Sequence, residues 1–385
     1  MNYKIFQCLL LTAGIVFFNA FNSFSQSRTD SVPQKKKLEI GIYNFNYLRD
    51  YEYFSPITEG YTLFGSIVQP TLVFNSSDKI SFRSGVFIQQ NFGDDSIRIQ
   101  PTFLLTIRNK KNDFCIGNYR NENGHQLIEP LWFSDNLVTD NIENGYNLKQ
   151  KLKHFEIDSW LDWNRAIKKG SDFQEKVFGG VTLNFNPNKN NHRLIQFPIQ
   201  ICIQHIGGQI NQPDTSFYVQ TILNGAVGIK SEIGEVEHYP IRISAEAYFV
   251  YFRDYSPNPN LFFKEGNGIW AIIKMKSKKG FGIEAAYWQG KNFISPKGNS
   301  LVQSVESVYP SKGYSEKDRK LFFFTIKYEK EIAKNAVLML SGEPYYDFKN
   351  KLLEYGIHLH LLFKLNEDAH LIKGTKNSFP RIIDP

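Results

Sequence analysis

Long stretches of the chain alternate between apolar and polar residues with a period of two. The clearest example is the segment 97–108, in which one parity is apolar throughout apart from Pro101, and the other parity carries Arg98, Gln100, Thr102, Thr106 and Arg108. A period of two is typical of β-strands with two different faces, whereas helical spacing fits this segment badly. The pattern therefore predicts an all-β protein.

The same alternation recurs along almost the whole chain. It predicts strands at 61–74, 79–92, 154–164, 174–185, 195–205, 217–230, 241–252, 268–276, 280–289, 321–330, 335–346 and 352–364, with weaker ones near 38–48 and 112–119. These windows run to about 10–14 residues, whereas strands of soluble proteins are most often about 5–6 residues long. A tilted strand needs about 9–11 residues to cross a bilayer. We therefore expect a transmembrane antiparallel barrel of about 14–16 strands, with an even number.

The links between these strands are of two kinds. Several are short and polar, while the links 120–150, 254–267 and 290–319 are long. Short turns at one rim and long loops at the other are typical of bacterial barrels. Aromatic residues near strand ends, among them Tyr43 and Trp288, would then form an interfacial girdle. A secreted β-sandwich with a buried aromatic core is the alternative, because alternation alone does not require a membrane.

The N-terminus has the layout of a secretory signal peptide. A basic start at Met1–Lys4 is followed by the apolar run 5–18, and the small residues Ser23 and Ser25 follow that run. We therefore expect residues 1–25 to be a cleaved signal, 26–37 a flexible polar lead-in, 38–365 the barrel and 366–385 a polar tail. Export and amphipathic strands together predict a location in the cell outer membrane.

Composition excludes several other classes. Of the 385 residues, 15% are aromatic, which is not typical of a disordered chain. Past residue 25 no apolar run is long enough for a membrane helix. The formal charge of +7 comes from basic residues scattered among acidic ones, so no nucleic-acid partner is expected. Three cysteines cannot form a disulfide scaffold.

The signal segment that ends in Asn22, Ser23, Phe24, Ser25 and Gln26, together with the amphipathic strands, resembles Gram-negative outer-membrane β-barrel proteins of the porin-like kind. The resemblance implies an up-and-down barrel that contacts outer-membrane lipid and the outer-membrane insertion machinery. A weaker resemblance, to porins that export alginate-type acidic polysaccharides, is supported only by polar residues predicted to face the lumen.

Those lumen candidates are charged or aromatic residues on the polar parity of predicted strands. Acidic residues on one wall and basic residues on another would create a field that selects solutes. The candidates are Arg83, Arg98, Arg108, Glu156, Asp158, Trp160, Asp162, Arg242 and Glu246. The alternative is that these side chains pair with one another and select nothing.

These observations predict a porin-like channel for small solutes or polysaccharide. The alternative is a plugged structural or assembly barrel whose loops 120–150 and 290–319 dock a lipoprotein or a secretion component. The spacing of Glu156 and Asp158 also suits a barrel-embedded hydrolase, but the sequence contains no known catalytic motif, so we do not expect an enzyme. His358 and His360, on one face with Glu354, are too few to predict a metal site, and no cofactor is expected.

Overall fold

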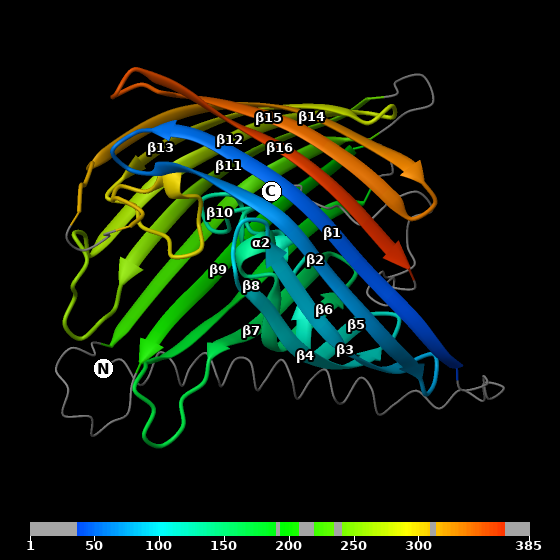
Figure 1. The fold of residues 1–385 in the computed structure, drawn as a ribbon. Coiled ribbons are helices and arrows are strands. Elements are labelled where there is room, and N and C mark those ends of the chain that lie inside the picture. Colours follow the sequence, from blue (N-terminus) through cyan, green and yellow to red (C-terminus); the bar gives the residue numbers. More distant parts are fainter. Residues whose placement is uncertain (1–36, 190–192, 208–218, 235–240, 309–312, 366–385) are drawn as a thin grey trace.

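Sixteen antiparallel strands close into a barrel in the computed structural model (Figure 1). Each strand pairs with its neighbours in the sequence, and β1 pairs with β16 to close the sheet. The structure describes residues 37–189, 193–207, 219–234, 241–308 and 313–365. The predicted signal peptide 1–25, most of the lead-in 26–37 and the tail 366–385 lie outside the described residues. Predictions of an all-β fold, an up-and-down barrel and an even strand number within 14–16 are confirmed.

The strands are β1 Lys37–Phe54, β2 Glu59–Asn75, β3 Ile80–Asn91, β4 Ile97–Arg108, β5 Asn112–Arg120, β6 Ile142–Lys151, β7 Phe155–Arg165, β8 Glu175–Lys189, β9 Arg193–Gly207, β10 Gln220–Ile233, β11 Ile241–Asp254, β12 Glu265–Ser277, β13 Phe281–Lys291, β14 Asp318–Ala333, β15 Ala336–Asp347 and β16 Leu352–Leu365. Three short helical turns lie between strands: η1 Gly124–Gln126, α2 Asn136–Thr139 and η2 Ser300–Val302. Among the described residues, no helix is both long enough and apolar enough to cross a bilayer.

The alternation along each strand sorts its side chains between lipid and interior. On β16, Leu353, Ile357 and Leu361 are exposed on the outside, while His358 and His360 between them are buried. A barrel with an apolar exterior and a polar interior is the arrangement of outer-membrane proteins. The predicted outer-membrane location is confirmed on this basis.

One strand and several rings differ from the predictions. Strand β6 lies inside the predicted loop 120–150, because its sequence IENGYNLKQK carries few apolar residues and so shows no alternation. Tyr43 and Trp288, predicted for the interfacial girdle, are buried inside the barrel instead. Their parity on β1 and β13 points them inward, which proximity to a strand end cannot reveal.

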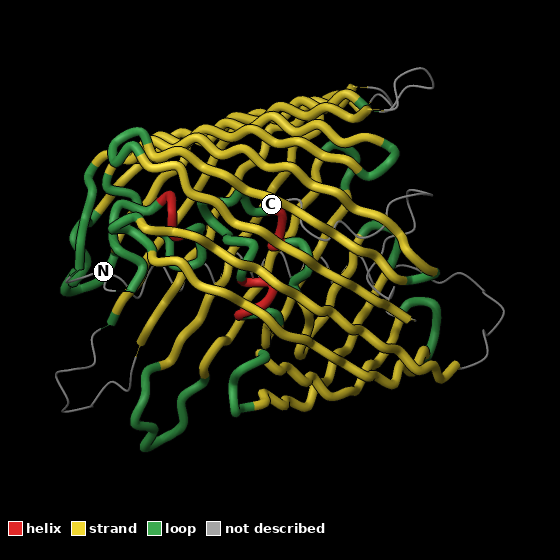
Figure 2. Tube along the Cα trace, turned by 45° about the horizontal axis from the view of Figure 1, so that its top comes forward, coloured by secondary structure: helices red, strands yellow, loops and turns green. Residues whose placement is uncertain are grey.

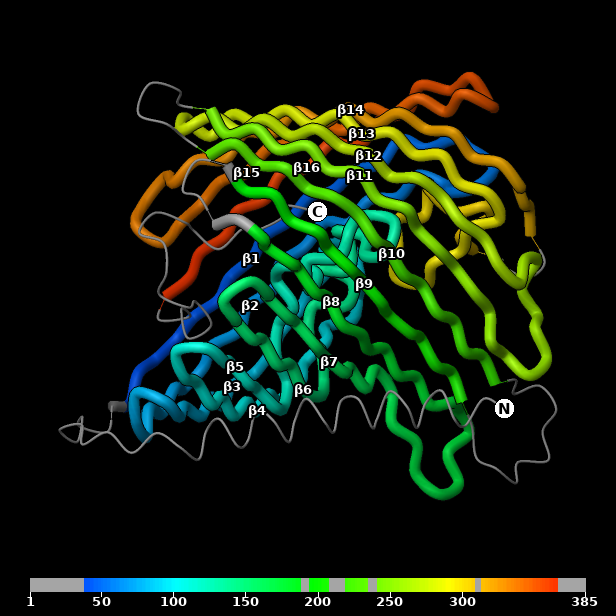
Figure 3. Tube along the Cα trace, turned by 180° about the vertical axis from the view of Figure 1, so that it is seen from behind, coloured from blue at the N-terminus to red at the C-terminus, as the bar shows by residue number. Residues whose placement is uncertain are grey.

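Two long loops fold back into the barrel and fill part of its interior. They connect β5 to β6 (residues 121–141) and β13 to β14 (residues 292–317), and they carry the helical turns η1, α2 and η2. Figure 2 shows the helical turns inside the lattice of strands, and Figure 3 shows the first loop among β5–β9 from behind. Apolar residues of both loops, including Leu131, Trp132, Phe293 and Leu301, form one buried core with the inner wall.

The two rims of the barrel differ. The rim at which β1 begins and β16 ends also carries the short turns, such as 109–111 and 334–335. Both inward-folding loops start from the opposite rim. Because bacterial barrels keep short turns on the periplasmic side, the long-loop rim is the external one.

Candidate functional site

The first inward loop begins with a sharp left-handed turn at its only histidine. Gly124, His125 and Gln126 all have positive φ angles, of 56°, 54° and 59°. A Cβ atom on Gly124 would lie 2.5 Å from the ring of Trp132, so a larger residue would not fit there. Non-glycine residues in this region are strained, and such strain tends to persist at functional sites. The turn presents the His125 side chain to the wall formed by β6 and β7.

His125 lies between two carboxylates. Its Nε2 atom is 2.9 Å from Oε2 of Glu143 on β6, and its Nδ1 atom is 3.4 Å from Asp158 on β7. All three side chains are buried, with exposed fractions of 1%, 0% and 3%. Asn121 supports the turn, because its Nδ2 donates to Glu143 and its Oδ1 accepts from the backbone N–H of His125. Both ring nitrogens are thus held by acidic groups.

Two tryptophans enclose the His125 ring. Trp160 of β7 stacks on it with ring centroids 3.9 Å apart and nearly parallel planes, and Trp132 of the loop approaches it edge-on at 6.4 Å. The indole Nε1 atoms of both tryptophans are buried and have no hydrogen-bond partner within the described part of the chain. Buried donors are usually paired, so two unpaired ones beside a histidine need an explanation.

The carboxylates change the acidity of His125. Burial alone would lower its pKa, but the charges of Glu143 and Asp158 outweigh burial and raise the pKa to about 9. His125 therefore carries a proton at neutral pH. Lys149 lies 3.8 Å from Asp158, and Asn147 also donates to that carboxylate. The site therefore consists of charged side chains in contact, from Glu143 through His125 and Asp158 to Lys149, rather than of an isolated histidine.

Further along the same loop, Glu129 is buried at the contact between the two loops. Its Oε1 accepts a hydrogen bond of 3.1 Å from Asn299 of the second loop, and its Oε2 is buried without a partner among the described residues. Burial raises the pKa of Glu129 to about 8. The backbone nearby is fixed by Gln200 of β9, which bonds to Gln126 O and Ile128 N.

A second polar cluster ties the loop to β1 and β2. Asp135 accepts hydrogen bonds of 2.5 Å from Arg49, Tyr51 and Tyr61. Arg49 is fully buried, and its Nε also donates to His360 of β16 at 3.1 Å. Together with the Gln200 contacts, this cluster stretches the loop across the interior from β1 to β9.

The structure places the predicted lumen residues on the inner wall but brings only three of them to the histidine. Asp158 and Trp160 contact His125, and Asp162 accepts from the backbone N–H of Asn144, which is next to Glu143. The others lie elsewhere: Arg108 pairs with Asp113, Arg242 with Glu232 and Glu246 with Lys230. Arg98 lies over the Phe87 ring, and Arg83 and Glu156 are on β3 and β7.

Sequence reasoning missed His125, Glu143 and Glu129. The first and last lie in a loop without periodicity, and Glu143 lies on the strand that the pattern did not predict. The signal that could have pointed to them is the density of histidine, acidic and tryptophan residues in the segment 121–143. Within the described part of the chain, no three His, Cys, Asp or Glu side chains are arranged to hold a metal ion.

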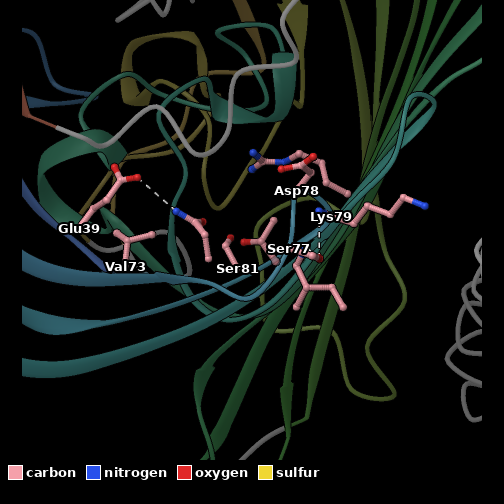
Figure 4. A pocket seen from close by; sticks show the side chains of 10 residues that line it. Glu39, Val73, Ser77, Asp78, Lys79 and Ser81 are labelled. Carbon is pink, nitrogen blue, oxygen red and sulfur yellow. Dashed lines mark hydrogen bonds between the residues drawn. The ribbon is translucent and has the colours of Figure 1, made fainter. Parts of the chain in front are cut away.

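A separate cavity lies at the periplasmic rim. It has a volume of about 250 Å³ and is lined by Glu39, Asp78, Lys79 and Arg108 among others, around the turn between β2 and β3 (Figure 4). It is at the opposite end of the barrel from the rim where the loop of His125 starts. Its walls are a turn and strand ends, so it does not belong to the histidine site.

Comparison with known families gives one match that covers most of the chain. The family model described as lipid A 3′-O-deacylase-type matches residues 27–372. No curated protein is similar enough in sequence to count as a match.

Solved structures share the architecture at low identity. OmpT of Vibrio cholerae, as a mutant that lacks loop L8, has a TM-score of 0.53 and 9% identity over 86% of this chain and 100% of its own. OprD of Pseudomonas aeruginosa has a TM-score of 0.50 and 10% identity over 88% and 96%. An anion-selective porin from Comamonas acidovorans has a TM-score of 0.50 and 7% identity over 86% and 100%. At such identities only the fold is shared.

The family match corrects the functional predictions. A porin-like channel, and its alternative of a structural or docking barrel, are both wrong, because the matching family is one of enzyme barrels that deacylate lipid A. The prediction of a non-enzyme is wrong for the same reason. The selectivity role of the lumen residues loses its basis with the channel. The channel prediction rested on the polar inner face of the strands. That face is polar in a barrel filled by loops as well as in an open barrel, so it does not distinguish the two.

Proposed function

Because this chain belongs to the lipid A 3′-O-deacylase-type family, we propose that it hydrolyses an ester-linked acyl chain of a lipid A-type glycolipid, with His125 as the acid–base group. The observation that carries this assignment is the buried histidine between two carboxylates. Ester hydrolysis needs a group that removes a proton from the attacking water and returns it to the leaving oxygen. Histidine is the side chain most often used for that transfer.

The two carboxylates have different roles in this proposal. Glu143, at 2.9 Å and anchored by Asn121, holds the ring through Nε2–H. The contact between Asp158 and Nδ1 is longer, at 3.4 Å, so Nδ1 is the atom that exchanges this contact for the attacking water. Once formed, the imidazolium is stabilised by both negative charges.

The unpaired tryptophan donors support an acyl carbonyl at this position. In the transition state of ester hydrolysis the carbonyl oxygen becomes negative, and fixed N–H donors stabilise that charge. Nε1 of Trp132 and Nε1 of Trp160 lie beside the His125 ring as buried donors that no described residue pairs with. We assign them to the carbonyl oxygen of the substrate. The second ester product, the free glycolipid hydroxyl, leaves with the proton from Nδ1.

The test is acyl release from purified lipid A in mixed micelles, followed by mass spectrometry. The variant His125→Gln should lower kcat/KM by at least about 100-fold, since positioned proton transfer contributes about 10²–10⁴. His154→Gln is the matched control, because the His154 ring bonds to the backbone O of Asn186 near the periplasmic turn, away from His125. Heat-modifiable gel mobility verifies that both variants are folded. Equal activity of His125→Gln and wild type would overturn the assignment.

The pH profile gives a second check. If His125 acts as the base, kcat/KM should rise with pH and level off near the pKa of about 9, because the neutral imidazole is the active form. A profile that is flat from pH 6 to pH 10 would contradict this role.

A further inference from the structure

The His125 site is closed on the sides that the described residues define. The ring is 1% exposed, and the second inward loop covers the first from above, where a Cβ on Gly298 would lie 2.0 Å from Pro130 O. A lipid substrate lies in the outer leaflet and cannot cross the barrel interior from the periplasm. An acyl ester can reach His125 only through the wall, so the wall beside the site decides access.

The seam between β4 and β5 is the weakest in that wall. Only residues 104–108 of β4 pair with residues 113–117 of β5, which makes five residue pairs. The other edge of β4 forms eleven pairs with β3, from Ile107 up to Ile97. In the described part of the chain, the external half of β4, residues 97–103, therefore pairs with no residue of β5. Unpaired backbone facing hydrocarbon is costly, so it is expected only where it serves a purpose.

The sequence explains where the seam ends. Gly117 has φ of +127°, and a Cβ there would lie 2.0 Å from Phe103 O, so the chain can turn away from β4 only at a glycine. The N–H of Phe103 points to the β5 side, where it donates to the Asn118 side chain. Backbone N–H groups alternate between the two edges of a strand, so the backbone N atom of Pro101 lies on the same edge as that of Phe103. Proline has no N–H, so it cannot donate a hydrogen bond to β5 there. Continued pairing is thus disfavoured on both strands.

Side-chain amides bridge the gap instead of backbone. Asn144 Oδ1 accepts from Gln100 of β4 at 3.1 Å and from Asn118 of β5 at 2.8 Å. Asn144 directly precedes Gly145 and follows Glu143, the residue that holds His125. The bridge across the seam is therefore next in sequence, on β6, to the residue that holds His125. Side-chain hydrogen bonds of this kind contribute only about 1 kcal/mol each, so they can exchange with a ligand.

The outer face of the seam suits an acyl chain. Ile97, Ile99 and Phe103 project outward and are 56%, 64% and 53% exposed. They line the unpaired edge on the external half of the barrel, at the level of the outer leaflet. A saturated chain that lies on these side chains has its ester end at the amide bridge.

From this geometry we propose that the β4–β5 seam is the lateral entry site for the substrate acyl chain. The amide bridge of Gln100, Asn118 and Asn144 opens, and the ester passes from the outer leaflet to His125. The proposal rests on the proposed function, since it assigns the route of the same substrate. Entry through the wall implies that the substrate is a membrane lipid rather than a soluble ester.

The test locks the seam with a reversible disulfide. The pair Gln100→Cys with Asn144→Cys joins the strands across the bridge, in a background of Cys115→Ala and Cys202→Ala that removes the two thiols of the barrel. The control pair, Ala247→Cys with Ala271→Cys, joins residues that already face each other on β11 and β12. Oxidation should lower acyl release from lipid A at least tenfold in the seam variant only, and reductant should restore it. Unchanged activity of the oxidised seam variant would overturn the route while leaving the hydrolase assignment intact.

A second measurement does not depend on turnover. In a His125→Gln background, lipid A with a photoreactive diazirine near the ester should label residues 121–143 when the seam is reduced. That labelling should disappear when the disulfide forms. Labelling confined to the outer residues Ile97, Ile99 and Phe103 in both states would overturn the entry route, whether or not the wild-type protein hydrolyses the lipid.

Discussion

The two loops that fill the barrel share one apolar core but differ in their polar contacts with the wall. The loop 121–141 is fixed by polar contacts to many strands, through His125 to β6 and β7 and through Asp135 to β1 and β2. The loop 292–317 packs mainly through apolar residues such as Phe293, Leu301 and Val305. Both loops contain a non-glycine residue with positive φ and buried polar atoms without a partner among the described residues, but only the first carries a histidine, which lies between two carboxylates. In the proposed function, the first loop supplies the acid–base group and the second packs against it.

The charged anchor of the second loop should have the largest effect on stability. Arg319 is fully buried and binds Glu316 at 2.8 Å, Asp347 at 2.7 Å and Leu301 O. Arg319→Ala removes the buried guanidinium that Glu316 and Asp347 share and leaves them mainly the neutral donors of Asn350, so it should destabilise the loop by about 3–5 kcal/mol. Proteolysis between residues 292 and 317 should increase strongly. Lys320→Ala, at an exposed neighbour, is the control, and equal protection in both variants would contradict an anchor at Arg319.

The two loops should respond to pH in opposite directions, because burial lowers the pKa of Lys297 in the second loop to about 8, so its penalty is relieved as pH rises. His125 has its pKa raised to about 9, so the stability that its charge confers is complete below pH 6.5 and is lost as pH rises through 9. A rise of this size corresponds to roughly 3 kcal/mol. Glu129, whose pKa is raised to about 8, acts in the same direction, because ionisation of a buried carboxyl opposes folding.

Hydrogen exchange by mass spectrometry measures this difference. Protection of residues 121–141 should fall between pH 6.5 and 9 after correction for intrinsic exchange rates, while protection of residues 293–305, which include Lys297, should not fall. His125→Gln should flatten the response of the first loop. Parallel loss in both loops would mean that they open as one unit, and the comparison would fail.

Removing one charge from the histidine site should affect catalysis more than folding. Glu143→Gln keeps the shape of the side chain and its contact with Asn121 but removes the charge that holds Nε2–H. We expect kcat/KM to fall about 100-fold, and the pH at which activity levels off should move down because the His125 pKa falls. Glu316→Gln in the second loop is the comparison and should leave that pH unchanged. An unaltered pH profile of Glu143→Gln would count against its orienting role.

The sequence was sufficient for the barrel but not for the site. Alternation identifies strands such as β4 and β16 because each residue's environment follows from its parity alone. Asp158, Trp160 and Asp162 were placed on an inner face by the same logic. His125 could not be found this way, since its partners Glu143 and Asp158 are 18 and 33 residues distant and meet it only after the loop folds inward. A left-handed turn in a loop produces no periodic pattern of apolar and polar residues in the sequence.

The smallest expected effect concerns the contact between the two loops. Asn299 donates to Glu129, and its backbone N–H also donates to Glu129 O at 3.1 Å. Asn299→Ala removes the side-chain bond to Glu129 and the bond that Asn299 Oδ1 accepts from the N–H of Leu301, so the loss should be about 2 kcal/mol in denaturant unfolding. Asn136→Ala is the control, because its side chain contacts Lys297 O rather than a carboxylate.

The Asn299→Ala variant distinguishes two possible roles of the loop 292–317. If the second loop merely fills space, Asn299→Ala leaves exchange in residues 121–141 as it is. If Asn299 also holds Glu129 in place, exchange near Glu129 increases and its pKa rises further, because that hydrogen bond favours the ionised carboxylate. We expect the second result. The Glu129 titration, followed by infrared absorption of the carboxyl, decides between them, and an unshifted titration would make the loops independent of each other.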